Sequence, residues 1–270
     1  MKWLVLCLIV LPTHLFAQGN LMIYPKRLVF EDVKRSREIS LLNNGKDTAR
    51  YVLSVMQFRM KTDGSFQAIT EPDSGQRFAD RNFRFFPRTV VLAPGESQTV
   101  KVQLIKTSEL TEGEYRSHLY VRAQAEEKPL GQSGTKIKPS SIAINIVPVF
   151  GLSIPIIIKV GQSSTKLDIV EKSITMLEKT TPILNLKFKR TGNMSVYGDI
   201  SAEYVSSSGK RTTVGLIQGV AIYAPSAFRS FQIPLEKTKG IVYNKGKLHI
   251  SYSEQSGTRV TFADTELPLQ

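Results

Sequence analysis

Few residues in this chain have side chains and spacings suited to chemistry. His118 and His249 could act as general bases or metal ligands, but they stand far apart in the sequence. The carboxylate pairs Glu31–Asp32 and Glu126–Glu127 could serve acid–base catalysis, yet both fall in predicted turns or loops, where a solvated role explains them better. No nucleophile-elbow, zinc-protease, P-loop or dinucleotide-binding motif occurs. The sequence therefore predicts a protein that is not an enzyme and uses no metal or cofactor.

A cluster of Phe83, Phe85 and Phe86 alternates with arginines such as Arg84 and Arg88, a pattern that could stack nucleic-acid bases. The formal net charge of +13 is spread over both halves of the chain, whereas a nucleic-acid-binding arm would concentrate it. We therefore interpret the cluster as a core-and-edge β-strand and expect no nucleic-acid partner.

The elements that must position any functional residue are β-strands. Short runs rich in Val, Ile, Tyr and Phe alternate with turn residues along the 270 residues, and no helical periodicity is long enough to compete. In residues 98–105, Val100, Val102 and Leu104 should face one way, and Lys101 and Gln103 the other. These patterns predict an all-β protein of two immunoglobulin-like β-sandwiches.

The N-terminal residues Met1–Ala17 combine Lys2, an unbroken apolar run and a small residue at a plausible cleavage position. This is the layout of a secretory signal peptide. The alternative is a short membrane anchor, but the run is well below the ~20 residues that span a bilayer. We expect a signal peptide over 1–17, a first sandwich over 18–159 and a second over 160–270. Cleavage would remove Cys7, the only cysteine, so no disulfide is expected in the exported protein.

A polar segment, residues 125–140, is followed by the most apolar stretch after the N-terminus, residues 141–160. Within it Ile142, Ile144 and Ile146 alternate with other residues, so in a strand all three would line one face. They could fill the core of their own sandwich, or they could be presented to a partner.

Several motifs together resemble the family of periplasmic pilus (fimbrial) chaperones. Lys26–Phe30 is similar to the family's first strand, Leu92–Val100 to a turn between two core strands, and Tyr115–Arg122 to the strand that follows. The three isoleucines fall where the family places its alternating donor residues. The resemblance covers most of 21–159, and it implies two sandwiches in an L or boomerang arrangement.

The resemblance also implies a function in the periplasm. The partner would be a pilus or fimbrial subunit whose own sandwich lacks a strand, so that its groove exposes apolar side chains and unpaired backbone groups. Ile142, Ile144 and Ile146 would complete that groove by donor-strand complementation, and the subunit would pass to an outer-membrane usher. An unoccupied apolar strand also makes self-association plausible when no subunit is bound.

The family binds the subunit's C-terminal carboxylate with an arginine on the first strand, where this chain has Arg27. A guanidinium suits this role because it forms two parallel hydrogen bonds with a carboxylate. The family's second anchor is a lysine, but Gly151 stands in its place. The chain could use Arg27 alone, the backbone N–H of Gly151, the nearby Lys159 or a different anchor. A contrasting interpretation is a secreted immunoglobulin-like structural or binding module without chaperone activity.

Overall fold

The computed structural model describes residues 21–31, 35–124, 150–178, 180–238, 240–255 and 260–269. In these ranges the regular elements are β-strands and two short 3-10 helices, η1 (Asp80–Asn82) and η2 (Thr107–Glu109). The predicted all-β class is therefore confirmed. No helix within the described ranges is long and apolar enough to cross a membrane. The expected signal peptide and the polar segment 125–140 lie outside the described residues.

The first sandwich consists of two facing sheets. One has the order β1-β3-β8-β6 and the other β2-β10-β9-β4-β5, with β7 paired to β4. The strands are β1 (Leu21–Tyr24), β2 (Leu28–Phe30), β3 (Ser36–Asn43), β4 (Ala49–Met60), β5 (Phe66–Ile69), β6 (Phe83–Phe86), β7 (Thr89–Leu92), β8 (Ser97–Leu104), β9 (Gly113–Gln124) and β10 (Gly151–Val160). Val100, Val102 and Leu104 are buried in the shared core while Lys101 is exposed, as the alternation predicted.

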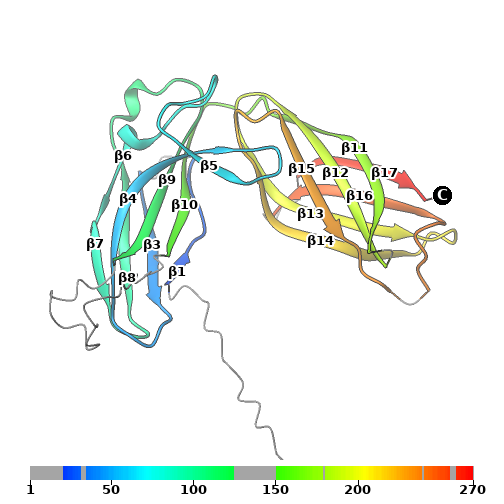
Figure 1. The fold of residues 1–270 in the computed structure, drawn as a ribbon. Coiled ribbons are helices and arrows are strands. Elements are labelled where there is room, and N and C mark those ends of the chain that lie inside the picture. Colours follow the sequence, from blue (N-terminus) through cyan, green and yellow to red (C-terminus); the bar gives the residue numbers. More distant parts are fainter. Residues whose placement is uncertain are drawn as a thin grey trace, which may run out of the picture.

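The second sandwich has sheets of order β11-β12-β15 and β14-β13-β16-β17 around a separate core that includes Phe188 and Tyr252. Its strands are β11 (Lys166–Leu177), β12 (Thr181–Thr191), β13 (Val196–Val205), β14 (Arg211–Ile222), β15 (Phe228–Pro234), β16 (Lys247–Glu254) and β17 (Thr261–Pro268). The two sandwiches stand at an angle, and the β4–β5 hairpin extends from the first toward the second (Figure 1). The predicted pair of sandwiches in an L arrangement is thus confirmed.

Two segments that pattern alone predicts as single strands, 21–30 and 83–92, are each divided at a proline. Pro25 separates β1 from β2, and Pro87 separates β6 from β7, so the chain passes from one sheet to the other at each proline. Proline has no N–H for the ladder, which suits a point where pairing changes sheets.

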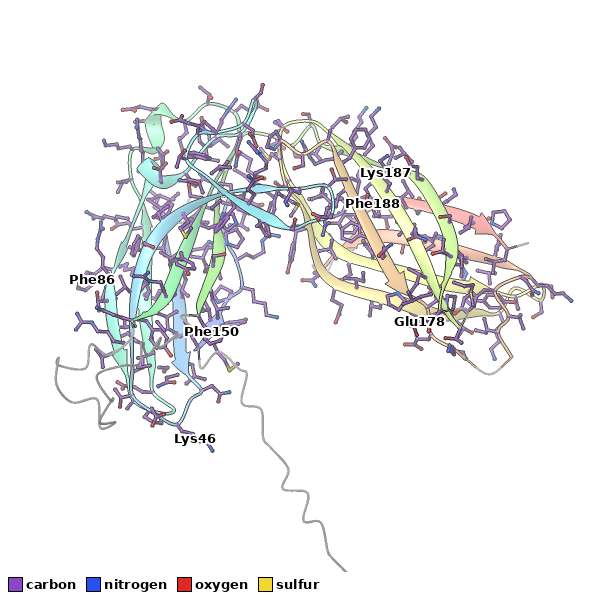
Figure 2. The ribbon with its side chains drawn as sticks, viewed as in Figure 1. Lys46, Phe86, Phe150, Glu178, Lys187 and Phe188 are labelled. Carbon is purple, nitrogen blue, oxygen red and sulfur yellow. The ribbon has the colours of Figure 1, made fainter. Side chains whose placement is uncertain are left out.

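The phenylalanine cluster lies on β6. Phe83 and Phe85 are buried in the core of the first sandwich, whereas Phe86 is exposed (Figure 2). This is the core-and-edge strand that the sequence predicted in place of a base-stacking surface.

The strands that sequence reasoning missed are β5, β11 and β17, and each lies at the end of a strand order. Residues of β11 and β17 are mostly exposed or half-buried. Because an edge strand is covered on fewer sides, it needs fewer apolar residues and leaves a weak pattern in the sequence.

Candidate functional site: an open strand edge and an arginine pair between the sandwiches

Strand β10 is paired unequally on its two sides. It pairs antiparallel with β9 along its whole length, but β2 runs parallel beside it only at Ile156–Ile158. Among the described residues, no strand therefore pairs with the β2 side of Gly151–Pro155. Such an unpaired edge is a template on which another strand can form a ladder.

The hydrogen-bonding direction along β10 shows which groups face this edge. The Ala123 N–H donates to the carbonyl of Phe150 over 3.1 Å, so Phe150 bonds toward β9. Because successive residues of a strand point their backbone groups to opposite sides, Gly151 and Ser153 direct theirs away from β9. The open edge thus presents backbone donors and acceptors from Gly151 and Ser153.

The side chains of this strand change from buried to exposed toward its N-terminal end. Ile154, Ile156 and Ile158 are buried in the core of the first sandwich. Phe150 and Leu152 have the same parity, but they are 57 % and 44 % exposed; Phe150 is labelled in Figure 2. The apolar alternation therefore continues beyond the covered core, next to the open edge.

The predicted donor residues Ile142, Ile144 and Ile146 lie outside the described residues and stay a prediction. Phe150 and Leu152 were missed because the sequence predicts a donor strand that pairs freely only up to about Val147, with Leu152–Lys159 finishing the first sandwich and leading into the second. Their signal was available in the sequence, since they share the parity of the three isoleucines.

Arg27 lies just before β2, where the two sandwiches meet. Its guanidinium carbon is 3.9 Å from the centroid of the Tyr197 ring on β13 of the second sandwich. Its Nε and Nη1 atoms are buried and have no hydrogen-bond partner among the described residues. The face of the Tyr197 ring supplies part of the stabilisation that a buried cation needs. It does not replace the hydrogen-bond acceptors that Nε and Nη1 lack.

Arg116, on β9, is a second arginine at the same place. Its side chain is nearly covered, with 3 % of the residue exposed, and its guanidinium carbon is 4.1 Å from the Tyr223 ring centroid. Nη2 donates to the Phe58 carbonyl over 3.4 Å, while Nε and Nη1 lack partners in the described part of the chain. Burial lowers the pKa of Arg116, and the charge of Glu114 opposes this shift.

Arg27 directly precedes β2 and Arg116 lies on β9 of the same sheet, and each arginine contacts a tyrosine of the second sandwich. Arg116 is opposite Ile157, and Ile157 is opposite Val29, so the three lie in one row across β9, β10 and β2. Burial raises the pKa of Tyr223, and the charges of both Arg27 and Arg116 oppose the shift. Sequence reasoning found Arg27 but read Arg116 only as part of a strand motif.

Glu114 is a buried carboxylate close to the arginine pair, but its oxygens bond elsewhere. They accept hydrogen bonds from the backbone N–H of Ser195, at 2.7 Å, and from the Ser195 hydroxyl. Glu114 thus offsets part of the positive charge without satisfying the free guanidinium N–H groups. Two guanidinium groups with unused donors at the junction of the sandwiches are suited to binding a carboxylate.

The structure bears on two of the other positions that the sequence left open, Gly151 and Lys159. A Cβ added to Gly151 would lie 2.2 Å from the hydroxyl oxygen of Tyr120, so the tyrosine ring occupies the place of a side chain there. Lys159 forms an ion pair with Glu31. Its charge is therefore already engaged.

The histidines take structural positions. His118 is buried and packs edge-on against Phe58 and Phe66, with centroids 5.0 and 5.6 Å away. Burial, with a further contribution from the charge of Arg116, lowers its pKa to about 3, so the ring is neutral at pH 7. His249 lies 3.6 Å from a carboxylate oxygen of Glu203 on the second sandwich. The described residues contain no group of three or more ligand-type side chains that could hold a metal ion.

Comparison with known proteins gives matches among solved structures only. No family model matches the sequence, and no curated protein matches it. The class 5 fimbriae chaperone CfaA is 15 % identical, with a TM-score of 0.44 over 93 % of this chain and 99 % of that one. The YadV chaperone is 12 % identical, with a TM-score of 0.45 over 92 % and 100 %. The CupB2 chaperone of Pseudomonas aeruginosa is 10 % identical, with a TM-score of 0.42 over 92 % and 100 %.

Proposed function

We propose that this protein is a periplasmic chaperone that holds subunits of a pilus or other surface fibre by donor-strand complementation and delivers them for assembly at the outer membrane. The observation that carries the proposal is the open edge of β10, where Phe150 and Leu152 extend the apolar alternation past the core of the first sandwich. The motifs that resemble pilus chaperones support the same assignment.

The open edge offers both parts of a strand-addition site. The backbone groups of Gly151 and Ser153 can pair with a subunit strand, and Phe150 and Leu152 can enter its groove from alternate positions. Ile142, Ile144 and Ile146 would extend this contact toward the N-terminal side. Each isoleucine that becomes fully buried would contribute about 1.5–3 kcal/mol relative to exposure.

Arg27 and Arg116 would bind the C-terminal carboxylate of the subunit. Both present guanidinium N–H groups that have no partner among the described residues, and both lie where the sandwiches meet. Arg116 would then take the part for which the family uses a lysine, at a different position from Gly151. The carboxylate would set the register of the added strand, because the arginines hold one of its ends.

The proposed setting is the periplasm, reached through a cleavable signal peptide, with an outer-membrane usher as the second partner. The protein would act without catalysis, since binding by an edge strand and two arginines needs no reacting group. An empty chaperone could also cover its apolar edge by pairing with a second copy.

A test of donor-strand complementation compares two substitutions of similarly exposed apolar residues. Leu152 on β10 is 44 % exposed and Val170 on β11 is 45 % exposed, so Leu152→Asp and Val170→Asp place a charge at matched sites. We expect native mass spectrometry of periplasmic extracts to show the wild type and Val170→Asp bound to a smaller subunit, and Leu152→Asp free of it. Ile144→Asp should also lose the subunit.

The folded state of each variant is checked by its thermal unfolding, which should stay close to that of the wild type for Leu152→Asp and Val170→Asp because both residues are exposed. If Leu152→Asp and Ile144→Asp capture the subunit as well as the wild type does, donor-strand complementation is refuted. A wild type that never co-purifies with a subunit would instead favour a secreted structural or binding module.

A further inference from the structure

The second sandwich has a cavity at the end remote from the arginine pair. It has a volume of about 850 Å³ and lies between the ends of β11 and β17 and the residues 237–238 and 241–244, which come after β15 and before β16. This volume falls in the range of roughly 300–1,000 Å³ that is typical of small-molecule sites. Met176 and Val242 contribute to its lining although each is more than half exposed.

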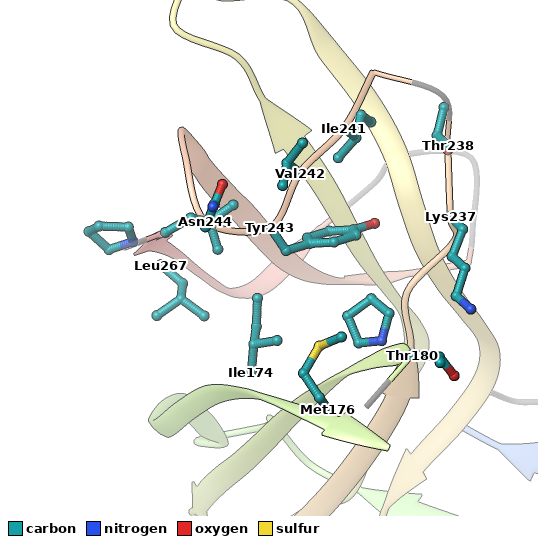
Figure 3. A pocket seen from close by; sticks show the side chains of 13 residues that line it. Ile174, Met176, Thr180, Lys237, Thr238, Ile241, Val242, Tyr243, Asn244 and Leu267 are labelled. Atoms are coloured by element: carbon teal, nitrogen blue, oxygen red, sulfur yellow. The ribbon is translucent and has the colours of Figure 1, made fainter. Parts of the chain in front are cut away.

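The polarity of the lining differs between its two ends. Lys237, Thr180 and Thr238 lie at one end, and Ile174 and Leu267 lie toward the other (Figure 3). Lys237 is the one charged side chain among the described lining residues. At the opposite end, Asn244 is the only polar side chain among the lining residues that the structure describes (Figure 3).

The side chain of Tyr243 lines the cavity midway between these two ends (Figure 3). Its hydroxyl donates a hydrogen bond to the Glu236 carbonyl over 2.7 Å and points toward the Lys237 end in Figure 3. Burial raises the pKa of this hydroxyl to about 12, with a smaller contribution from the charge of Glu236, so Tyr243 is neutral at pH 7. The phenol therefore does not neutralise Lys237.

We propose that this cavity binds a long-chain aliphatic carboxylate, with the carboxylate at Lys237 and the chain running past Met176 toward Ile174 and Leu267. A single-chain anion fits because, among the described lining residues, the positive charge lies at one end of a mainly apolar space. The two threonines beside Lys237 can donate hydrogen bonds to a small head group. This site lies in the second sandwich, and its binding of a ligand does not depend on donor-strand complementation by the first.

The test measures the binding of dodecanoate to the full mature chain by isothermal titration calorimetry, below the critical micelle concentration. We expect one saturable site, and roughly tenfold weaker binding of dodecyltrimethylammonium, which has the same chain and the opposite charge. Lys237→Ala should weaken dodecanoate binding roughly two- to fivefold, as the loss of a partly exposed ion pair does, and Lys237→Arg should retain it.

A matched pair of substitutions on β11 tests the place of the chain. Ile174→Trp should fill the cavity and abolish binding, while Val170→Trp, on the same strand but outside the lining, should leave binding unchanged. Thermal unfolding of each variant without ligand shows that it is folded.

Four results would overturn the proposal: no saturable binding of dodecanoate to the wild type, equal loss in the two tryptophan variants, equal affinity for the cationic amphiphile, or tighter binding of dodecanoyl lysophosphatidylglycerol than of dodecanoate. The last result would assign the cavity to a phospholipid head group. Concentration-dependent dimerisation that Ile174→Trp prevents, without dodecanoate binding, would assign it to a second copy of the chain.

Discussion

Arg27 and Arg116 carry charge in a place where water is largely excluded. A buried charge is costly unless hydrogen bonds and an opposite charge compensate it. The rings of Tyr197 and Tyr223 and the nearby Glu114 supply part of this compensation. A carboxylate that accepted the remaining N–H groups would add charge-assisted hydrogen bonds in a region of low dielectric, where they are strongest.

The arginine pair predicts a preference for a free C-terminal carboxylate. Arg27→Gln or Arg116→Gln should weaken binding of a peptide with the C-terminal sequence of the captured subunit by about 10- to 100-fold, from the loss of charged hydrogen bonds. Fluorescence anisotropy with the free-acid and amidated peptides measures this, and each variant should prefer the free acid less than the wild type does. Arg122→Gln, on the same strand but exposed, is the control. If the wild type also binds both forms equally, the pair is not the carboxylate anchor.

His118 predicts a pH dependence of stability. Its pKa is about 3 in the folded protein, against the ordinary histidine value of 6.5, so below pH 6.5 the unfolded chain binds a proton that the folded chain does not. The stabilisation from the neutral ring is complete above pH 6.5 and is lost as the pH falls toward 3. At about 1.4 kcal/mol per pH unit, the loss between pH 6.5 and 5 is about 2 kcal/mol.

Urea unfolding at pH 7 and pH 5 measures this loss. The pH dependence of His118→Gln should be smaller than that of the wild type by about 2 kcal/mol, because glutamine does not titrate. An unchanged pH dependence in His118→Gln would show that another group causes the effect.

At the scale of the element, β10 combines a structural half with a binding half. From Ile154 to Ile158 alternate side chains fill the core, while Leu152 and Phe150 reach past it beside an unpaired edge. Pairing with β9 along the whole strand holds both halves in one register. The rigid half therefore fixes the direction in which the open edge is presented.

This division predicts that shortening a side chain lowers stability in the structural half of β10 and weakens subunit capture in the binding half. Ile156→Ala should lower the free energy of unfolding by about 2–5 kcal/mol, because it leaves a cavity in the core. Leu152→Ala should change it by about 0.5 kcal/mol or less but weaken subunit capture. Urea unfolding and native mass spectrometry measure the two effects. A large loss of stability in Leu152→Ala would place that side chain in the core instead.

At the scale of the molecule, contacts between the sandwiches keep the arginine pair assembled. The Ser230 N–H donates to the Thr62 carbonyl over 2.8 Å, so the β4–β5 turn caps the edge of β15. Met60, Ile157 and Tyr223 form a small apolar cluster across the junction. Because Arg27 and Arg116 each contact a tyrosine of the second sandwich, a change in the angle between the sandwiches would disassemble the site.

Ser195 links the two sandwiches through its side chain, and its removal should allow the angle between them to vary more. The Ser195 hydroxyl donates to Glu114 and accepts from the Ala224 N–H over 2.9 Å. Ser195→Ala leaves both groups without this partner and should cost about 1–3 kcal/mol. Small-angle X-ray scattering should give Ser195→Ala a broader pair-distance distribution than the wild type. Ser208→Ala, which changes a serine in an exposed turn, is the control and should match the wild type. An unchanged distribution would show that the other contacts set the angle alone.

The sequence by itself determined the all-β class, the two sandwiches and most strands, because alternation and turn residues are local properties of the chain. It also singled out Arg27 through a short motif, and it predicts Ile142, Ile144 and Ile146 as donor residues. It could not place Arg116, because alternation shows that a side chain leaves one face of a strand but not what covers that face. Only the tertiary structure decided that β9 meets the second sandwich there, and that the β2 side of β10 is paired over three residues and open before them.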